Sequence, residues 1–194
     1  DVLYQAIAFS ADSRVIIDSS KHPIYGYLLK FLPSLDVYLL HLVRDPRAVA
    51  YSWMNPKPSG DKNAPDMMGY MDAKLSAIVW NIWNLLAEYI GHQKPDRYFF
   101  LRYEDFTLQP ELAISKILGF IGEEGNGPLF GHDVTIQLGK THTISGNPDR
   151  FKCGPMRIRD DTRWINKMQL KNKAAVTLLT LPLLIRYRYQ LHFW

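Results

Sequence analysis

The chain has 194 residues, 47% of them hydrophobic, so one domain can bury a sizeable core. Its single cysteine, Cys153, cannot form an internal disulfide and lacks metal-ligand spacing around it. This excludes a disulfide scaffold and a zinc module, and it favours a reducing, cytoplasmic location. The net charge of +4 permits an anionic partner, but the basic residues are dispersed, so nucleic-acid binding is not expected.

The first part of the chain alternates predicted strands and helices. Residues 13–20 are a β-branched run typical of a buried strand, and a helix is expected at 22–33. The next strand is predicted at 36–43, followed by a helix over 46–54. The proline-rich segment 55–66 is predicted to be a loop.

The remaining elements continue this alternation. Apolar residues repeat at helical spacing over 72–89, a third strand is expected at 97–106, and a helix at 109–122. From Glu123 the sequence becomes loop-rich and basic, and it closes with a helix kinked or broken at Pro182. The apolar run before its end is too short to span a membrane, no signal-peptide pattern opens the chain, and no oligomeric state is indicated.

These elements predict an α/β fold in one domain over 1–194, with a parallel sheet flanked by helices. Ligands bind such sheets at the carboxyl ends of the strands. Polar clusters follow the predicted strands: D-S-S-K-H at 18–22, R-D-P-R at 44–47 and R-Y-E-D at 102–105. A binding site is therefore expected where these clusters meet.

The R-D-P-R cluster has the chemistry of a phosphate site. Arg44 can hold two phosphate oxygens, a helix starting at Pro46 offers backbone N–H groups, and Ser52 lies in that helix. The alternative is structural: Arg44 pairs with Asp45 or Glu104, and Ser52 bonds its own backbone.

The segment V-R-D-P-R-A-V-A-Y-S, residues 43–52, resembles the 3'-phosphate-binding segment of sulfotransferases that use 3'-phosphoadenosine 5'-phosphosulfate (PAPS). In that family the pattern is a strand, then R-D-P-R, then a serine eight residues after the first arginine. The resemblance implies that Arg44 and Ser52 hold the 3'-phosphate of PAPS or of its product, adenosine 3',5'-bisphosphate (PAP).

Further blocks follow in the order of the family, here of the bacterial and carbohydrate type. V-I-I-D-S-S-K-H-P starts at Val15, L-R-Y-E-D-F-T-L-Q-P implies that Tyr103 lies by the adenine, and I-R-D-D-T-R-W ends at Trp164. H-T-I-S-G-N-P-D-R-F resembles the block that closes the cofactor site, and it supplies His142, Asn147 and Arg150.

The resemblance implies a P-loop-NTPase-like sulfotransferase fold. Members of the family begin with a strand and a glycine-rich loop that holds the 5'-phosphosulfate, and this sequence contains no such segment. We therefore expect an N-terminally truncated domain, the C-terminal portion of a longer one.

Sulfuryl transfer needs cations near the leaving group and a base for the acceptor proton. Lys21 is the candidate cation, and His22 is the first candidate base, with a surface role as its alternative. His142 is the other candidate base. Asp18 better suits a structural role, such as capping the helix after His22.

Other conspicuous residues receive structural interpretations. Glu104 and Asp105 would point to opposite faces of a strand, which argues against a catalytic carboxylate pair. Core packing is favoured over a stacking platform for the tryptophans Trp53, Trp80 and Trp83. Arg47 has no assigned role, and its replacement by alanine is expected to weaken phosphate binding less than that of Arg44.

The predicted function is transfer of a sulfuryl group from PAPS to a hydroxyl or amine of a small molecule, lipid or sugar, without a metal. A nucleotide kinase-like phosphoryl-transfer protein is one alternative, although no G-x-x-x-x-G-K-[ST] is present. A non-enzymatic nucleotide-binding module is the other, and it is disfavoured because the aromatic residues follow core patterns.

Overall fold

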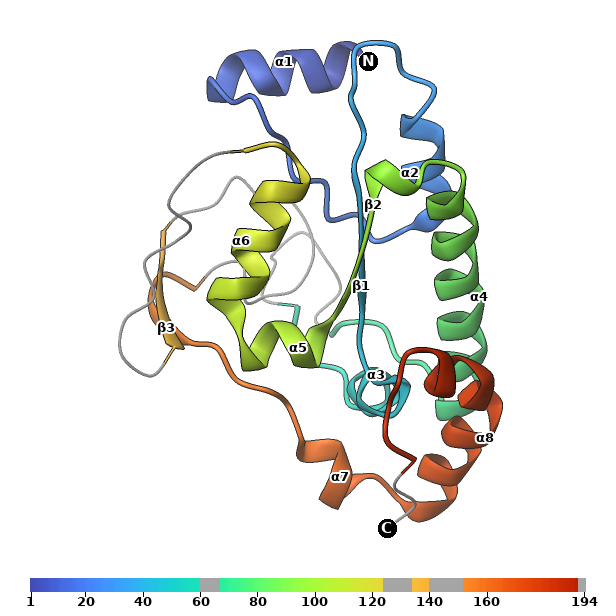
Figure 1. Ribbon diagram of the computed structural model, residues 1–194. Helices are drawn as coiled ribbons and strands as arrows, with labels where there is room; N and C mark the ends of the chain where they lie inside the picture. Colours follow the sequence, from blue (N-terminus) through green and yellow to red (C-terminus); the bar gives the residue numbers. More distant parts are fainter. Residues whose placement is uncertain (60–66, 124–133, 140–151, 192–194) are drawn as a thin grey trace.

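The computed structural model describes residues 1–59, 67–123, 134–139 and 152–191. At its centre lies a two-stranded parallel sheet of β1 (Leu39–Val43) and β2 (Tyr98–Arg102), in register from Leu39 opposite Tyr98 to Val43 opposite Arg102 (Figure 1). The predicted α/β character with a parallel sheet is thereby confirmed.

Helices lie on both sides of this sheet. Figure 1 shows α4 and α8 along one side of the strands and α5 and α6 on the other. The helices are α1 (Val2–Ala11), α2 (Pro23–Leu29), α3 (Pro46–Met54), α4 (Ala73–His92), α5 (Tyr103–Leu108), α6 (Pro110–Phe120), α7 (Arg163–Lys167) and α8 (Leu170–Arg186). A 3₁₀ turn η1 (Pro95–Arg97) precedes β2, and β3 (Thr135–Leu138) pairs antiparallel with β4 (Gly154–Arg157).

The two faces of β1 differ in burial because successive side chains of a strand point to opposite faces. His41 and Val43 are buried on the side of α4 and α8, and Val43 joins an apolar cluster with residues of both helices. Leu40 and Leu42, on the opposite face, remain 41% and 49% exposed. The sheet is therefore anchored mainly through the face covered by α4 and α8.

Small side chains bring α3 close to its neighbours. Ala48 and Ala50 on α3 pack with Ala77 on α4, Trp164 on α7 and Val176 on α8 in a second buried cluster. The start of α4 is fixed by Asp72, whose side chain accepts hydrogen bonds from the two backbone N–H groups that open the helix. Helix α3 thus packs against α4, α7 and α8 at the end of β1.

The prediction of a strand at 13–20 is wrong. This segment is irregular, and Val15 and Ile17 are 43% and 88% exposed. A strand is stabilised by hydrogen bonds to a neighbour, and within the described residues β1 pairs only with β2. Asp18 does not cap α2: it accepts hydrogen bonds from the Tyr4 hydroxyl and the Ser20 N–H.

Two predicted elements end earlier than expected. The strand predicted over 97–106 stops at Arg102, because the R-Y-E-D residues after it begin α5 instead. The helix predicted over 22–33 ends at Leu29 and continues only as turns. The helix at 46–54 has the predicted bounds, and α6 is followed as expected by Gly122, whose φ of 72° suits glycine.

The tryptophan prediction is confirmed for one residue of three. Trp80 is 6% exposed and belongs to the core, whereas Trp53 and Trp83 are each 37% exposed. Pro182 lies inside α8, which runs through it to Arg186. Across the described part of the chain, the helices are too short or too polar to cross a membrane.

Candidate functional site

The polar clusters after β1 and β2 lie side by side. Val43 and Arg102 end the two strands opposite each other, α3 begins just after β1 and α5 just after β2. As a result, Arg44 and Tyr103 leave the sheet together, and the Arg44 guanidinium carbon lies 5.0 Å from the centre of the Tyr103 ring. The sheet therefore brings a cation and an aromatic face together at its carboxyl edge.

Arg44 is held at both ends but keeps hydrogen-bonding capacity. Its backbone carbonyl accepts a 3.0 Å hydrogen bond from the Trp80 indole, and its Nη2 lies 3.3 Å from Oδ2 of Asp161. Its Nε is buried and has no hydrogen-bond partner among the described residues. The expected pairing with Asp45 or Glu104 is therefore replaced by a contact with Asp161.

Asp161 is a site residue that sequence reasoning did not single out. It follows β4 and accepts two 2.7 Å hydrogen bonds from the Arg163 guanidinium, from Nε and Nη2. These bonds from Arg163, with a further contribution from the charge of Arg44, hold the pKa of the carboxyl well below its usual range, although partial burial acts in the opposite direction. The I-R-D-D-T-R-W block thereby places a permanent anion beside Arg44.

Arg47 is a structural residue. Its side chain is only 2% exposed, and Nε and Nη2 donate 2.9 and 2.7 Å hydrogen bonds to the Asp45 carboxylate. Nη2 also donates to the carbonyl of Gln190, and the guanidinium carbon lies 4.6 Å from the ring centre of Trp164. The two arginines of R-D-P-R therefore have different surroundings: Arg44 faces the surface, and Arg47 ties α3 to the C-terminal segment.

The start of α3 is less open to an anion than the sequence suggested. The buried Asp45 carboxylate accepts the Arg47 backbone N–H at 2.8 Å, so a carboxylate of the chain already occupies this helix start. Ser52 lies exposed near the end of the same helix, and its hydroxyl has no hydrogen bond to another described residue. The Arg47 N–H is therefore not available to a ligand.

Glu104 connects the two strand ends to the C-terminal segment. Its Oε1 accepts the Asp45 backbone N–H at 3.0 Å, and its Oε2 accepts the Tyr189 hydroxyl at 2.7 Å. Burial raises the pKa of the Glu104 carboxyl, although these hydrogen bonds act against the rise. Tyr189 in turn lies 3.2 Å from the carbonyl of Val43. Glu104 and Tyr189 thus hold the backbone of the turn that carries Arg44.

Glu104 and Asp105 do not form a catalytic pair, but the reason differs from the one expected. Both residues lie in α5 rather than in a strand, and they have different partners. Asp105 accepts a 2.8 Å hydrogen bond from Nε of Arg102, whose Nη1 donates to the carbonyl of Arg188. Both carboxylates therefore have structural roles.

The catalytic candidates Lys21 and His22 lie apart from Arg44. Lys21 is exposed, with a φ of 65°, and His22 precedes α2, its ring 5.5 Å from that of Trp83. Within the described residues, neither one has a hydrogen bond, ion pair or ring contact with Arg44, Tyr103 or Asp161. Three further candidates, His142, Asn147 and Arg150, lie outside the described residues.

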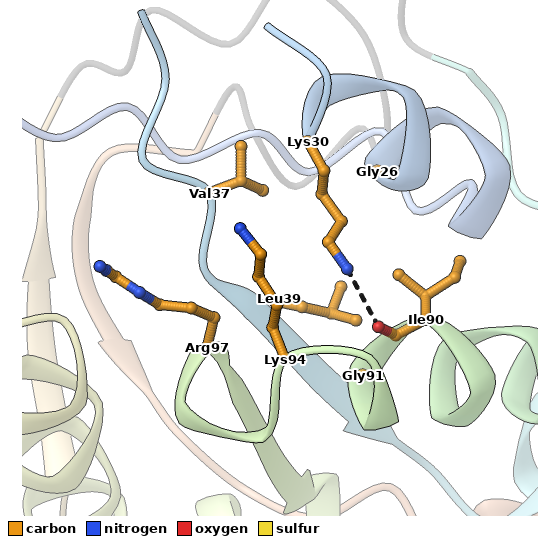
Figure 2. Close-up of a pocket in the computed structure, with 8 residues that line it drawn as sticks. All are labelled: Gly26, Lys30, Val37, Leu39, Ile90, Gly91, Lys94 and Arg97. Atoms are coloured by element: carbon orange, nitrogen blue, oxygen red, sulfur yellow. Dashed lines mark hydrogen bonds between the residues drawn. The ribbon is translucent and has the colours of Figure 1, made fainter. Parts of the chain in front are cut away.

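A small pocket opens at the other end of the sheet. Figure 2 shows its basic side chains Lys30, Lys94 and Arg97 together with Ile90 and Gly91 near the end of α4. Lys30 donates a 3.1 Å hydrogen bond from Nζ to the Ile90 carbonyl, and burial together with the charge of Lys94 lowers its pKa. These residues satisfy a helix end and lie away from the Arg44 turn.

The described residues contain no group of histidine, cysteine and acidic side chains that could hold a metal ion. At the carboxyl edge they bring together the Arg44 guanidinium and the Tyr103 ring, and Ser52 lies further along α3. Ligands of α/β proteins bind at this edge of a parallel sheet, so the turn that carries Arg44 is the candidate binding site.

Comparison with protein families identifies the class of the protein. The family model of the sulfotransferase domain matches residues 7–141, more than half of the chain, so the protein belongs to this family. The match supports sulfuryl transfer in general. It includes Lys21, His22, Arg44, Ser52 and Tyr103. No curated protein matches the chain in sequence.

Proposed function

We propose that the protein is an enzyme that transfers a sulfuryl group from PAPS to a hydroxyl or amine. The observation that carries this proposal is the partly exposed Arg44 guanidinium, stacked on Tyr103 at the carboxyl edge, with one 3.3 Å contact to Asp161. An arginine in this position suits a phosphate, because its N–H groups match two phosphate oxygens. The neighbouring ring suits an adenine.

The 3'-phosphate is assigned to Arg44 and Ser52. Arg44 supplies the charge, and the Ser52 hydroxyl, exposed two turns along α3, supplies a further donor. The buried pair of Asp45 and Arg47 fixes the first turn of that helix and so fixes the direction in which α3 leaves the strand. Asn147 and Arg150 are further candidates for the cofactor, on the basis of the family resemblance alone.

PAPS, when bound, supplies an activated sulfuryl group and leaves as PAP after transfer. For the acceptor proton, His22 and His142 remain the candidate bases, and Lys21 the candidate cation for the leaving group. His22 packs on Trp83, one turn of α4 after Trp80, which bonds the Arg44 carbonyl. A small molecule, lipid or sugar acceptor and a cytoplasmic location remain predictions.

Isothermal titration of the intact protein with PAP and with adenosine 5'-phosphate tests the proposal. The two nucleotides differ only in the 3'-phosphate, so the account predicts clearly tighter binding of PAP. Equal affinities would refute the assignment of Arg44 and Ser52. Sulfuryl transfer that persists in EDTA would separate the proposal from the kinase-like alternative, since phosphoryl transfer requires Mg²⁺.

A further inference from the structure

The carboxylate beside Arg44 suggests a role for a residue outside the family match. Asp161 contacts Arg44 at 3.3 Å, at a guanidinium that the proposed function assigns to a phosphate. We propose that Asp161 makes an autoinhibitory contact: it occupies Arg44 when no nucleotide is bound and competes with the 3'-phosphate for it. This inference rests on the proposed function.

Asp161 is bound more closely by Arg163 than by Arg44. Little free energy should therefore be lost when Arg44 leaves Asp161 for a phosphate. Arg163 donates two hydrogen bonds of 2.7 Å to the carboxylate, whereas Arg44 makes one longer contact. When Arg44 turns to a phosphate, the Asp161 charge stays compensated by Arg163. The carboxylate is also partly exposed, so water can replace the lost contact.

Arg44 does not need Asp161 to keep its position. The guanidinium rests on the Tyr103 ring, and the backbone is fixed by the hydrogen bond from Trp80 to the Arg44 carbonyl. Because these two supports remain when the carboxylate is neutralised, Asp161 acts on Arg44 as a competing anion rather than as a support. Removing its charge should strengthen phosphate binding.

A competing carboxylate affects only ligands that must displace it. A phosphate monoester carries up to two negative charges near neutral pH and can displace one carboxylate, whereas a nucleotide with a free 3'-hydroxyl offers Arg44 no anion. Asp161 therefore lowers the affinity for a 3'-phosphate and leaves the affinity for a nucleotide without that phosphate unchanged.

The test is titration of Asp161→Asn with PAP and with adenosine 5'-phosphate. PAP should bind about two- to fivefold more tightly than to the wild type, the range that a surface ion pair allows, while the affinity for adenosine 5'-phosphate stays unchanged. Asp160→Asn is the matched control: it removes the same charge from the neighbouring exposed residue and should change PAP affinity less. Arg163→Gln, which leaves Asp161 with Arg44 alone, should weaken PAP binding.

Thermal unfolding first establishes that each variant is folded. Weaker or unchanged PAP binding by Asp161→Asn overturns the proposal. An equal gain in PAP affinity in Asp160→Asn also overturns it, because it would indicate only a long-range electrostatic effect of the lost negative charge. These results differ from failure of the proposed function, in which the wild-type protein itself binds PAP and adenosine 5'-phosphate equally.

Discussion

The two ends of the central sheet both gather basic side chains, yet they use them differently. At the carboxyl end Arg44, Arg47 and Arg102 each contact a carboxylate, and α3 and α5 begin there. At the amino end α4 terminates, and Lys30 donates to one of its last carbonyls. A helix end attracts cations, whereas the start of a helix favours anions.

This difference separates structural cations from ones available to a ligand. Lys30 compensates a carbonyl of α4. Arg47 and Arg102 each pair with a carboxylate and also donate to backbone carbonyls of the C-terminal segment. Arg44 has the weakest carboxylate contact of the three arginines and a buried Nε without a partner among the described residues. A position at the carboxyl end is therefore not enough to make an arginine available to a ligand. The partners of each arginine decide whether it is structural or can bind a ligand.

The two arginines of R-D-P-R should contribute very differently to stability. Arg47→Ala should lower the free energy of unfolding by about 3–5 kcal/mol, because it leaves the buried Asp45 carboxylate without its partner. Arg44→Ala, which removes a partly exposed pair, should cost at most about 1 kcal/mol. Urea unfolding measures both, and equal losses would contradict the division of roles.

The close packing at the amino end of the sheet can be tested by substituting a glycine. A Cβ added at Gly91 would lie 2.2–2.6 Å from ring atoms of Tyr98, so Gly91→Ala should cost about 1–3 kcal/mol through forced movement of the ring. Gly119→Ala is the control, because Gly119 lies in α6 with nothing within 4 Å of the added atom. That variant should gain up to about 1 kcal/mol from helix propensity. Comparable losses of stability for Gly91→Ala and Gly119→Ala, measured by thermal or urea unfolding, would argue against the close packing of Gly91 on Tyr98.

His41 should make the anchored face of the sheet sensitive to acid. It is buried, its ring nitrogens lie 2.7 Å from the Tyr98 hydroxyl and 2.8 Å from Oδ1 of Asn84, and burial lowers its pKa. A lowered pKa means that the unfolded chain binds the proton first, so the stability that neutral His41 contributes is lost as pH falls below about 6.5.

Unfolding free energies measured between neutral and mildly acidic pH check this expectation. The wild-type protein should lose stability as the pH falls, and His41→Gln should remove part of that slope because glutamine does not titrate. Identical slopes for the two proteins would show that other groups cause the acid sensitivity.

The smallest effect is expected at the end of α4. Lys30→Met removes the hydrogen bond to the Ile90 carbonyl and should cost about 0.3–1 kcal/mol, typical of a cation at a helix end. Lys94→Met is the matched control and should be neutral or slightly stabilising, since it relieves repulsion between Lys94 and Lys30. A larger loss of stability in Lys94→Met than in Lys30→Met would show that Lys94, and not Lys30, stabilises the end of α4. Urea unfolding provides the comparison.

Local signals in the sequence predicted the elements that position the site. The bounds of α3 follow from Asp45 and Pro46 at its start, and the β1 strand from its apolar run. A run of β-branched residues was not enough at 13–20, because a strand also needs a neighbour to bond, and local sequence does not specify that neighbour.

Side-chain partners could not be predicted, because they come from distant parts of the chain. Arg47 is buried by Trp164 and the Gln190 carbonyl, and Arg44 meets Asp161, each more than a hundred residues away. The family resemblance singled out Arg44 but gave no partner for it. The I-R-D-D-T-R-W block was a usable signal for Asp161, although the sequence alone did not indicate which of its acidic residues reaches Arg44.

We propose that Arg44, and not Arg47, recognises the 3'-phosphate. The most direct test is the ratio of the dissociation constants for adenosine 5'-phosphate and PAP, measured by titration of the folded Arg44→Ala protein. This ratio should fall by about tenfold or more relative to the wild type, since a hydrogen bond to a charged group is worth about 1.5–3 kcal/mol. A wild-type ratio in Arg44→Ala would show that another residue binds the 3'-phosphate.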